Sequence, residues 1–182
     1  MHTMQYVATL VELDEPTDLD EVRAIAKAQV GDWLNEWSDE NGFVGGWSDW
    51  SMVGGRWDEV PVLVYTDENA CEFLEALDMV DLSQRSIFNE YLAEFDYPTI
   101  HTLMTKYGAG EEVNNKDIYE ANVYSLYQAL RILKGYWSYD SKFFDSINDT
   151  PQTSYLRKNL LETIDNPDPL VLYCLVPVDF HF

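Results

Sequence analysis

Residues 5–13, with the sequence QYVATLVEL, alternate between apolar and polar side chains and are rich in β-branched residues. This pattern predicts a strand, which Pro16 and Thr17 bring to an end. Residues 170–182, LVLYCLVPVDFHF, predict another strand, which alternates near its end. We expect these two strands to be neighbours in one sheet, although they come from opposite ends of the sequence. A short buried strand is predicted over residues 61–66.

Residues 18–40 predict a long helix after the first strand. Thr17 or Asp18 provides its N-cap, and Glu21 stands at capping-box spacing from Asp18. Six apolar side chains lie within about 80° of one another at 100° per residue, and they mark its core face: Leu19, Val22, Ala26, Val30, Trp33 and Trp37. Further helices are predicted over residues 67–77, 82–95 and 154–164.

The segment 117–137 predicts a helix that is apolar on most sides. Such a helix is buried centrally or lies in an interface, so it is compatible with a homodimer as well as with a core position. Terminal strands with helices between them predict an α+β fold, with a small, mainly antiparallel sheet and helices packed on one face. The length suits one domain over residues 1–182, with a helical insertion around 82–165 as a further option.

The charge balance is extreme, with 33 Asp and Glu against 11 Lys and Arg and a formal net charge of −22. Such a surface repels phosphate, so direct binding of nucleic acid is excluded. Apolar residues make up 46% and aromatic residues 14%, which is enough for a folded core and unlike an acidic disordered tail. Halophilic proteins are also acidic, but they are poorer in large aromatic residues and Asn than this chain.

Nothing in the sequence predicts a membrane protein. The longest apolar runs are too short to cross a bilayer, and residues 1–10 lack the basic and apolar regions of a signal peptide. The two cysteines, Cys71 and Cys174, are far apart and have no CxxC spacing. We therefore expect reduced thiols and a cytoplasmic protein.

The acidic residues are unevenly distributed, with 25 acids and 6 bases in residues 1–117 but 8 and 5 in residues 118–182. Five acidic side chains of the helix predicted over residues 18–40 fall within about 60° of one another around the helix axis. Three acidic side chains of the helix predicted over residues 67–77 also share one side. Either these are solvated faces and helix caps, or they form an acidic face that a Lys- and Arg-lined partner would bind in place of a nucleic acid. The residues of this face are Asp18, Glu21, Asp32, Glu36, Asp39, Glu68, Glu72 and Glu75.

The sharpest local motif is residues 45–57, GGWSDWSMVGGRW, with three Trp within eleven residues. Gly54 and Gly55 allow positive φ or close backbone approach. We expect Arg56 to pair with Asp49 or Asp58, or to stack on Trp50 or Trp57. The motif is either a structural corner or a ligand pocket, in which Trp rings stack a base and Arg56 holds a phosphate or carboxylate. The residues of such a pocket are Asp49, Trp50, Gly54, Gly55, Arg56, Trp57, Asp179 and His181.

The pattern D-W-x-x-x-G-G-R-W over residues 49–57, together with the closing D-x-H-hydrophobic tail of residues 179–182, resembles a family of mostly uncharacterised phage and mobile-element proteins. The resemblance covers the two ends and the loop, and it implies a phage-type protein acting in the cytoplasm of a host cell. It implies no particular chemistry. The chain departs from the family pattern after Trp57, where Asp58 and Glu59 stand in place of a glycine.

Signatures of catalysis are missing. The three histidines, His2, His101 and His181, have no metal-ligand spacing with each other or with the cysteines, and there is no nucleophile elbow, Walker loop or His-Glu-x-x-His. We therefore predict no catalytic residues, metal or cofactor. The predicted function is a host-defence antagonist, an anti-CRISPR or anti-restriction protein, that binds a basic nucleic-acid-handling protein through its acidic face. The alternative is a module that binds or sequesters a nucleotide in the Trp/Gly/Arg loop.

Overall fold

The computed structural model describes residues 1–41, 48–138, 140–165 and 168–181, with only the backbone described at 38–41 and 165. The chain divides into two compact units. Residues 1–83 and 137–182 form the sheet unit, and residues 84–136 form the helical unit. The helical segment between the two parts of the sheet unit is thus shorter than the range 82–165 suggested by the sequence.

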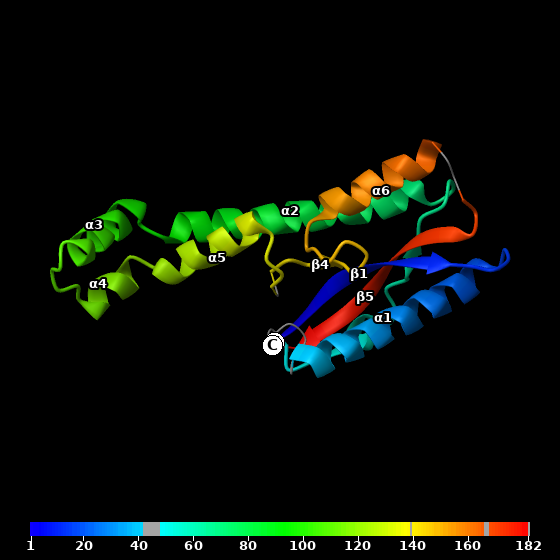
Figure 1. Cartoon of the computed structure of the whole chain (residues 1–182), viewed down its shortest axis with the longest axis horizontal. Helices are drawn as coiled ribbons and strands as arrows, with labels where there is room; N and C mark the ends of the chain where they lie inside the picture. The colour runs from blue at the N-terminus through cyan, green and yellow to red at the C-terminus, as the bar shows by residue number, and fades with distance from the viewer. Residues whose placement is uncertain (42–47, 139, 166–167, 182) are drawn as a thin grey trace. The chain divides into compact units, whose positions relative to one another are not determined.

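The sheet unit is built around two long antiparallel strands, β1 (His2–Glu12) and β5 (Val171–His181), which pair along their whole length (Figure 1). Two short strands, β2 (Trp50–Val53) and β3 (Leu63–Val64), pair antiparallel with β5, and β4 (Phe143–Asp145) pairs parallel with β1. The strand order is β2-β5-β1-β4, with β3 also beside β5. The prediction of an α+β fold with a mainly antiparallel sheet and adjacent terminal strands is confirmed.

Helices cover both faces of this sheet, where we expected them on one. The helix α1 (Leu19–Asn41) packs on the face that contains Val7 and Val176. The first part of α2 (Ala70–Glu94) and α6 (Thr153–Asp165) pack on the face that contains Ala8 and Leu175. The reason lies in the strands themselves, because alternate residues point to opposite faces and β1 and β5 are apolar on both.

The start of α1 follows the sequence prediction closely. The Asp18 carboxylate accepts hydrogen bonds from the backbone N–H groups of Asp20 (3.0 Å) and Glu21 (2.9 Å), as an N-cap does. The Thr17 hydroxyl donates to the Glu21 carboxylate. Of the predicted core face, Val22, Ala26 and Val30 are buried, and the other three residues are partly buried against the same core. Leu34, which the prediction did not include, is also buried.

Other element boundaries differ from the prediction. The helices expected over 67–77 and 82–95 are one continuous helix, α2. The helix expected over 117–137 is divided into α4 (Asn115–Glu120) and α5 (Val123–Lys134), because Asn122 has a left-handed backbone with φ of 50°. The Gly- and Trp-rich segment 41–57, whose composition predicts a loop, contains β2 and a 3₁₀ turn at Gly55–Trp57, while residues 42–47 of it lie outside the described part of the chain.

The helical unit contains the end of α2, α3 (Tyr97–Gly108), α4 and α5. Its buried centre is small and consists of Ile100, Leu103 and Ala121. The Asp96 carboxylate caps α3 by accepting hydrogen bonds from the Thr99 hydroxyl and backbone N–H, and these bonds lower its pKa. Across the described ranges of both units, no helix combines the length and apolar character needed to span a lipid bilayer.

Candidate functional site

A candidate site is formed where three aromatic side chains lie side by side on neighbouring strands. The pairing registers place His2 of β1 opposite His181 of β5, and Trp50 of β2 opposite His181 on the other side. Directly opposed residues project to the same face of a sheet. Asp179 lies two residues before His181, so it shares that face. It is the face that α2 and α6 cover further along the strands, and α1 covers the other one.

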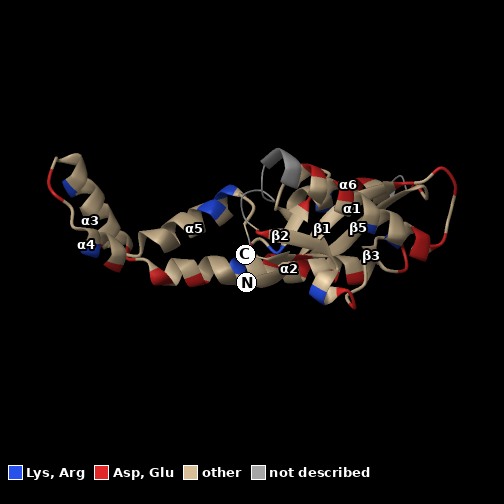
Figure 2. Ribbon diagram, turned by 90° about the horizontal axis from the view of Figure 1, so that it is seen from below, with Lys and Arg blue, Asp and Glu red and all other residues tan. Residues whose placement is uncertain are grey.

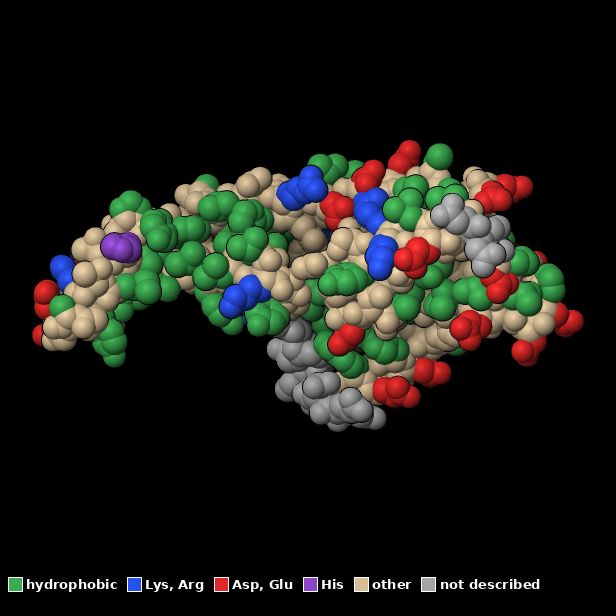
Figure 3. All heavy atoms as spheres, turned by 45° about the horizontal axis from the view of Figure 1, so that its top comes forward, with side chains coloured by type: hydrophobic (Ala, Val, Ile, Leu, Met, Phe, Trp, Pro, Cys, Tyr) green, Lys and Arg blue, Asp and Glu red, His purple; other side chains and the backbone are tan. Residues whose placement is uncertain are grey.

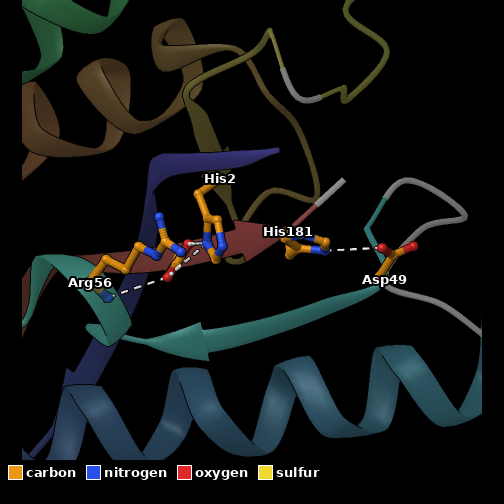
Figure 4. A network of polar contacts seen from close by, with 5 residues as sticks. His2, Asp49, Arg56 and His181 are labelled. Atoms are coloured by element: carbon orange, nitrogen blue, oxygen red, sulfur yellow. Dashed lines mark hydrogen bonds and ion pairs between the residues drawn. The ribbon is translucent and has the colours of Figure 1, made fainter.

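Asp179 is the buried centre of this site, with 1% of its side chain exposed. Its carboxylate lies 3.0 Å from Nδ1 of His2, and it accepts a hydrogen bond from the backbone N–H of Arg56 at 3.2 Å (Figure 4). These contacts compensate for the desolvation of the carboxylate. The bond from Arg56 also connects the Trp/Gly/Arg motif with the Asp179–His181 tail, because it attaches the 3₁₀ turn directly to β5.

Two glycines make this attachment sterically feasible. Gly54 and Gly55 have φ of 72° and 59°, which only glycine adopts readily. A Cβ on Gly55 would lie 2.6 Å from Cβ of Asp179, and one on Gly54 would lie 2.7 Å from a carboxylate oxygen of Asp58. The Gly-Gly pair therefore allows the backbone of the turn to approach the buried carboxylate.

A second histidine–aspartate pair lies beside the first. Nδ1 of His181 is 2.9 Å from a carboxylate oxygen of Asp49, and the His2 and His181 ring centroids are 4.8 Å apart. Trp50 stacks on His181, with an interplanar angle of 4° and a centroid distance of 5.6 Å. Its ring also meets the edge of His2. The site thus consists of two imidazoles, each held by a carboxylate, and one indole that is 40% exposed.

The side chain of Arg56 behaves differently from the expectation. Asp58 pairs with Lys27 and Asp49 with His181, and within the described ranges no carboxylate lies at ion-pair distance from the Arg56 guanidinium and no aromatic ring lies under it. The side chain is exposed and extends toward the His2–Asp179 pair in Figure 4. Trp57, which follows it, is half-buried.

The predicted acidic face consists of two groups on opposite sides of the sheet. Asp18, Glu21, Asp32 and Glu36 are exposed on or next to α1, while the side chain of Asp39 lies outside the described part of this helix. Glu68, Glu72 and Glu75 are exposed at and before the start of α2, which packs on the opposite face. The eight residues therefore do not form one face. A partner that binds on one side of the sheet contacts only one of the two groups.

The acidic residues of α1 are also unevenly spaced. Asp32 lies eleven positions after Glu21, a rise of about 16 Å at about 1.5 Å per residue. Helical geometry places Ile25, Ala28 and Gln29 in this interval, so α1 carries two acidic clusters and not a continuous row. A basic partner would therefore meet two separate groups of carboxylates on α1, one at its start and one around Asp32 and Glu36.

The net charge is concentrated on the sheet unit. It contains 26 acidic and 6 basic residues, a net charge of −20, whereas the helical unit has 7 and 5, a net charge of −2 (Figure 2). Most bases of the sheet unit are already paired: Arg23 with Asp20, Lys27 with Asp58, Arg157 with Asp78 and Asp81, and Lys158 with Glu162. Lys142 is half-buried and donates to the Thr3 hydroxyl, and burial lowers its pKa.

Throughout the described ranges, no group of three or more His, Cys, Asp or Glu side chains is placed to hold a metal ion. Cys71 is exposed and Cys174 is buried, and both are free thiols. Burial raises the pKa of the Cys174 thiol to about 12, so it is no nucleophile at neutral pH.

His2 is the site residue that sequence reasoning missed. The first strand was expected to begin at Gln5, whereas β1 begins at His2, three residues earlier. With β1 and β5 antiparallel along their full length, the second residue of the chain has to lie opposite the second-last. The signal was therefore the pairing of the terminal strands, extended to their ends.

The fold and the site define an α+β protein with a cluster of two histidine–aspartate pairs, a tryptophan and an arginine at one end of its sheet. Comparisons with protein-family models, curated proteins and solved structures find no match to this chain. Functional inference therefore rests on geometry and charge.

Proposed function

We propose that this protein is a phage-type antagonist of a host defence system, which binds a basic nucleic-acid-handling protein such as a CRISPR effector or a restriction enzyme. The acidic side chains of α1 would occupy the cleft in which the partner holds its DNA or RNA. The proposal is supported first by the net charge of −20 on the sheet unit. A surface of this charge attracts a basic cleft over several ångströms and speeds association.

The choice of α1 follows from what surrounds its acids. Asp32 and Glu36 are exposed one turn apart, and the described ion pairs leave both of them without a basic partner. Asp18 serves as the N-cap, so its carboxylate already has a structural role. On the α2 side, Glu68 and Glu75 are exposed in the same way, and they provide a comparison for any test of α1.

The experiment measures binding to two purified probes, an RNA-guided CRISPR nuclease and a restriction endonuclease, at increasing salt. We expect an affinity that falls about tenfold or more as the Debye length shrinks from about 10 Å to about 3 Å, and competition by the probe's own DNA substrate. The double substitution Asp32→Lys with Glu36→Lys should abolish binding, because it replaces attraction by repulsion.

The matched control is Glu68→Lys with Glu75→Lys, which changes the net charge equally but on the other side of the sheet. It should keep most of the affinity if α1 is the binding surface. Equal losses for the two double variants would contradict the assignment to α1. A complex that ignores salt, or no complex with either nuclease, would contradict the proposal itself.

A further inference from the structure

The cation Arg56 is unusual for this chain. The sheet unit has 26 acidic residues, yet its Arg56 guanidinium is exposed and has no ion-pair partner among the described residues. The backbone of the same residue is fixed by the hydrogen bond to Asp179 and by the two positive-φ glycines before it. A fixed backbone that presents an unpaired guanidinium suits a ligand with an anionic group, because guanidinium binds phosphate and carboxylate oxygens with paired N–H donors.

The two imidazoles next to it are oriented for a ligand as well. An ionised carboxylate can only accept hydrogen bonds, so Asp179 and Asp49 place the protons of His2 and His181 on Nδ1. Each Nε2 then remains for another partner, and within the described ranges neither makes a hydrogen bond to protein. Carboxylates that hold histidines in this way fix both the tautomer and the orientation of the ring.

Trp50 provides the flat surface of the cluster. One side of its ring lies on His181, and 40% of the residue remains exposed at the end of the sheet. An exposed indole that is held by a neighbouring ring loses little conformational entropy when it stacks on a ligand. Purine and pyrimidine bases stack on such rings irrespective of their sequence.

We propose that Arg56, His2, His181 and Trp50 form a binding site for a mononucleotide. The phosphate accepts hydrogen bonds from the Arg56 guanidinium and from the Nε2–H groups of the two rings in their imidazolium form, in which both ring nitrogens carry a proton. The base stacks on Trp50. A mononucleotide concentrates its charge at one point, unlike a polynucleotide, which would have to lie along a surface of net charge −20. At physiological ionic strength the Debye length is about 8 Å, so local donors decide the affinity for so small an anion.

This site is independent of the proposed function. It lies on the sheet face opposite α1, so a nucleotide and a partner bound at α1 would contact different residues. Charge reversal at Asp32 and Glu36 should therefore leave nucleotide binding unchanged. Failure of one proposal would leave the other standing.

The experiment is a calorimetric titration of the full chain with AMP, ATP, a cyclic mononucleotide and inorganic phosphate. We expect at least one nucleotide to bind, and Arg56→Ala to weaken it about tenfold or more, because a charge-assisted phosphate contact is lost. Trp50→Leu should weaken the nucleotide about tenfold while leaving inorganic phosphate unaffected, because only the base stacks. His2→Leu removes the imidazole and should weaken both ligands.

The control is Lys158→Ala, which removes the same charge from an exposed cation that pairs only with Glu162 on α6. It should bind like the parent protein, and circular dichroism should show all variants folded. Absence of binding by the parent protein, or full affinity in Arg56→Ala, would overturn the inference. Inorganic phosphate that binds as tightly as every nucleotide would overturn the role of Trp50 and with it the assignment to nucleotides.

Discussion

Gly55 lies directly against Asp179 of the C-terminal strand. Its φ of 59° and the separation of 2.6 Å that an added Cβ would have from Cβ of Asp179 leave no room for a side chain. We expect Gly55→Ala to lower the free energy of unfolding by about 2 kcal/mol or more, from the left-handed backbone and the displacement of Asp179 together. Urea unfolding followed by circular dichroism measures this change.

Gly108, at the end of α3, provides the comparison. A Cβ there would meet nothing within 4 Å, and its backbone does not have a positive φ. Gly108→Ala should therefore be neutral or stabilising by up to about 1 kcal/mol, as expected for alanine in a helix. If both substitutions had the same effect, the steric argument for the Gly-Gly pair would be wrong.

The two cysteines should differ sharply in reactivity. Cys71 is exposed, whereas Cys174 is buried and burial raises its pKa from 9.0 to about 12. A chromogenic disulfide reagent at pH 8 should react with one thiol per folded chain and with two after denaturation in urea. Two thiols reacting equally fast in the folded protein would contradict the burial of Cys174.

The same pKa shift predicts how stability changes at high pH. The folded protein holds the Cys174 proton more tightly than the unfolded chain, whose thiol titrates near its ordinary value. This contribution to stability is complete below pH 9 and is lost as the pH rises toward about 12, because unfolding then releases a proton. Cys174→Ser should reduce this particular pH dependence when unfolding is measured between these two values.

At the scale of single elements, the start of α1 tests how capping and charge differ. Asp18→Ala removes the acceptor for the backbone N–H groups of Asp20 and Glu21, and should cost about 1 kcal/mol of stability. Asp18→Asn removes the same charge but keeps the cap, so its stability should stay close to that of the parent protein. Urea unfolding of both variants separates the two roles. Equal destabilisation would show that the charge of Asp18, and not its hydrogen bonding, stabilises the helix.

The success of sequence reasoning also varied from element to element. The long terminal strands and α1 were predictable, because alternation and helical spacing over ten or more residues leave few alternatives. The three-residue strand β4 was not, since its pairing with β1 is decided by tertiary contacts. The break between α4 and α5 depends on the left-handed backbone of Asn122, which no apolar periodicity reveals.

For the candidate site, the sequence supplied the residues but not their arrangement. The Trp/Gly/Arg motif and the Asp179–His181 tail could be named from pattern and resemblance, and the structure brings them together. The absence of an ion pair at the Arg56 guanidinium, among the described residues, could not be predicted, because Asp49 and Asp58 lie near it in sequence and yet pair with His181 and Lys27. Sequence distance is a poor guide where several acids compete for few cations.

At the scale of the whole molecule, charge and apolar surface are divided between the two units. The helical unit has a net charge of −2 and exposes many large apolar side chains, which gather on the surface shown in Figure 3. In α5, the polar Ser125 and Gln128 are buried while Tyr127 and Leu133 are exposed, at 55% and 68%. Apolar side chains on the outer face of a helix indicate a partner surface.

We expect a second copy of the chain to cover this surface. Residues 121–138 contain no acid, and Arg131 and Lys134 lie at the end of α5. Asp117 and Glu120 lie in α4 just before it, where Glu120 also pairs with Lys116. Antiparallel pairing about a two-fold axis would place the cations of each copy near the acids of the other, so the surface is complementary to itself. Contact through units of net charge −2 also avoids the repulsion between two sheet units of −20 each.

Leu130→Glu should therefore convert a dimer into a monomer, because the two-fold axis brings the new carboxylate of each copy into an apolar contact. Sedimentation equilibrium at micromolar concentration measures the mass directly. Leu161→Glu on α6 introduces the same charge at a leucine that is also exposed, but in the sheet unit, and should leave the dimer intact. A monomeric parent protein at this concentration, or equal dissociation by both variants, would contradict pairing through α5.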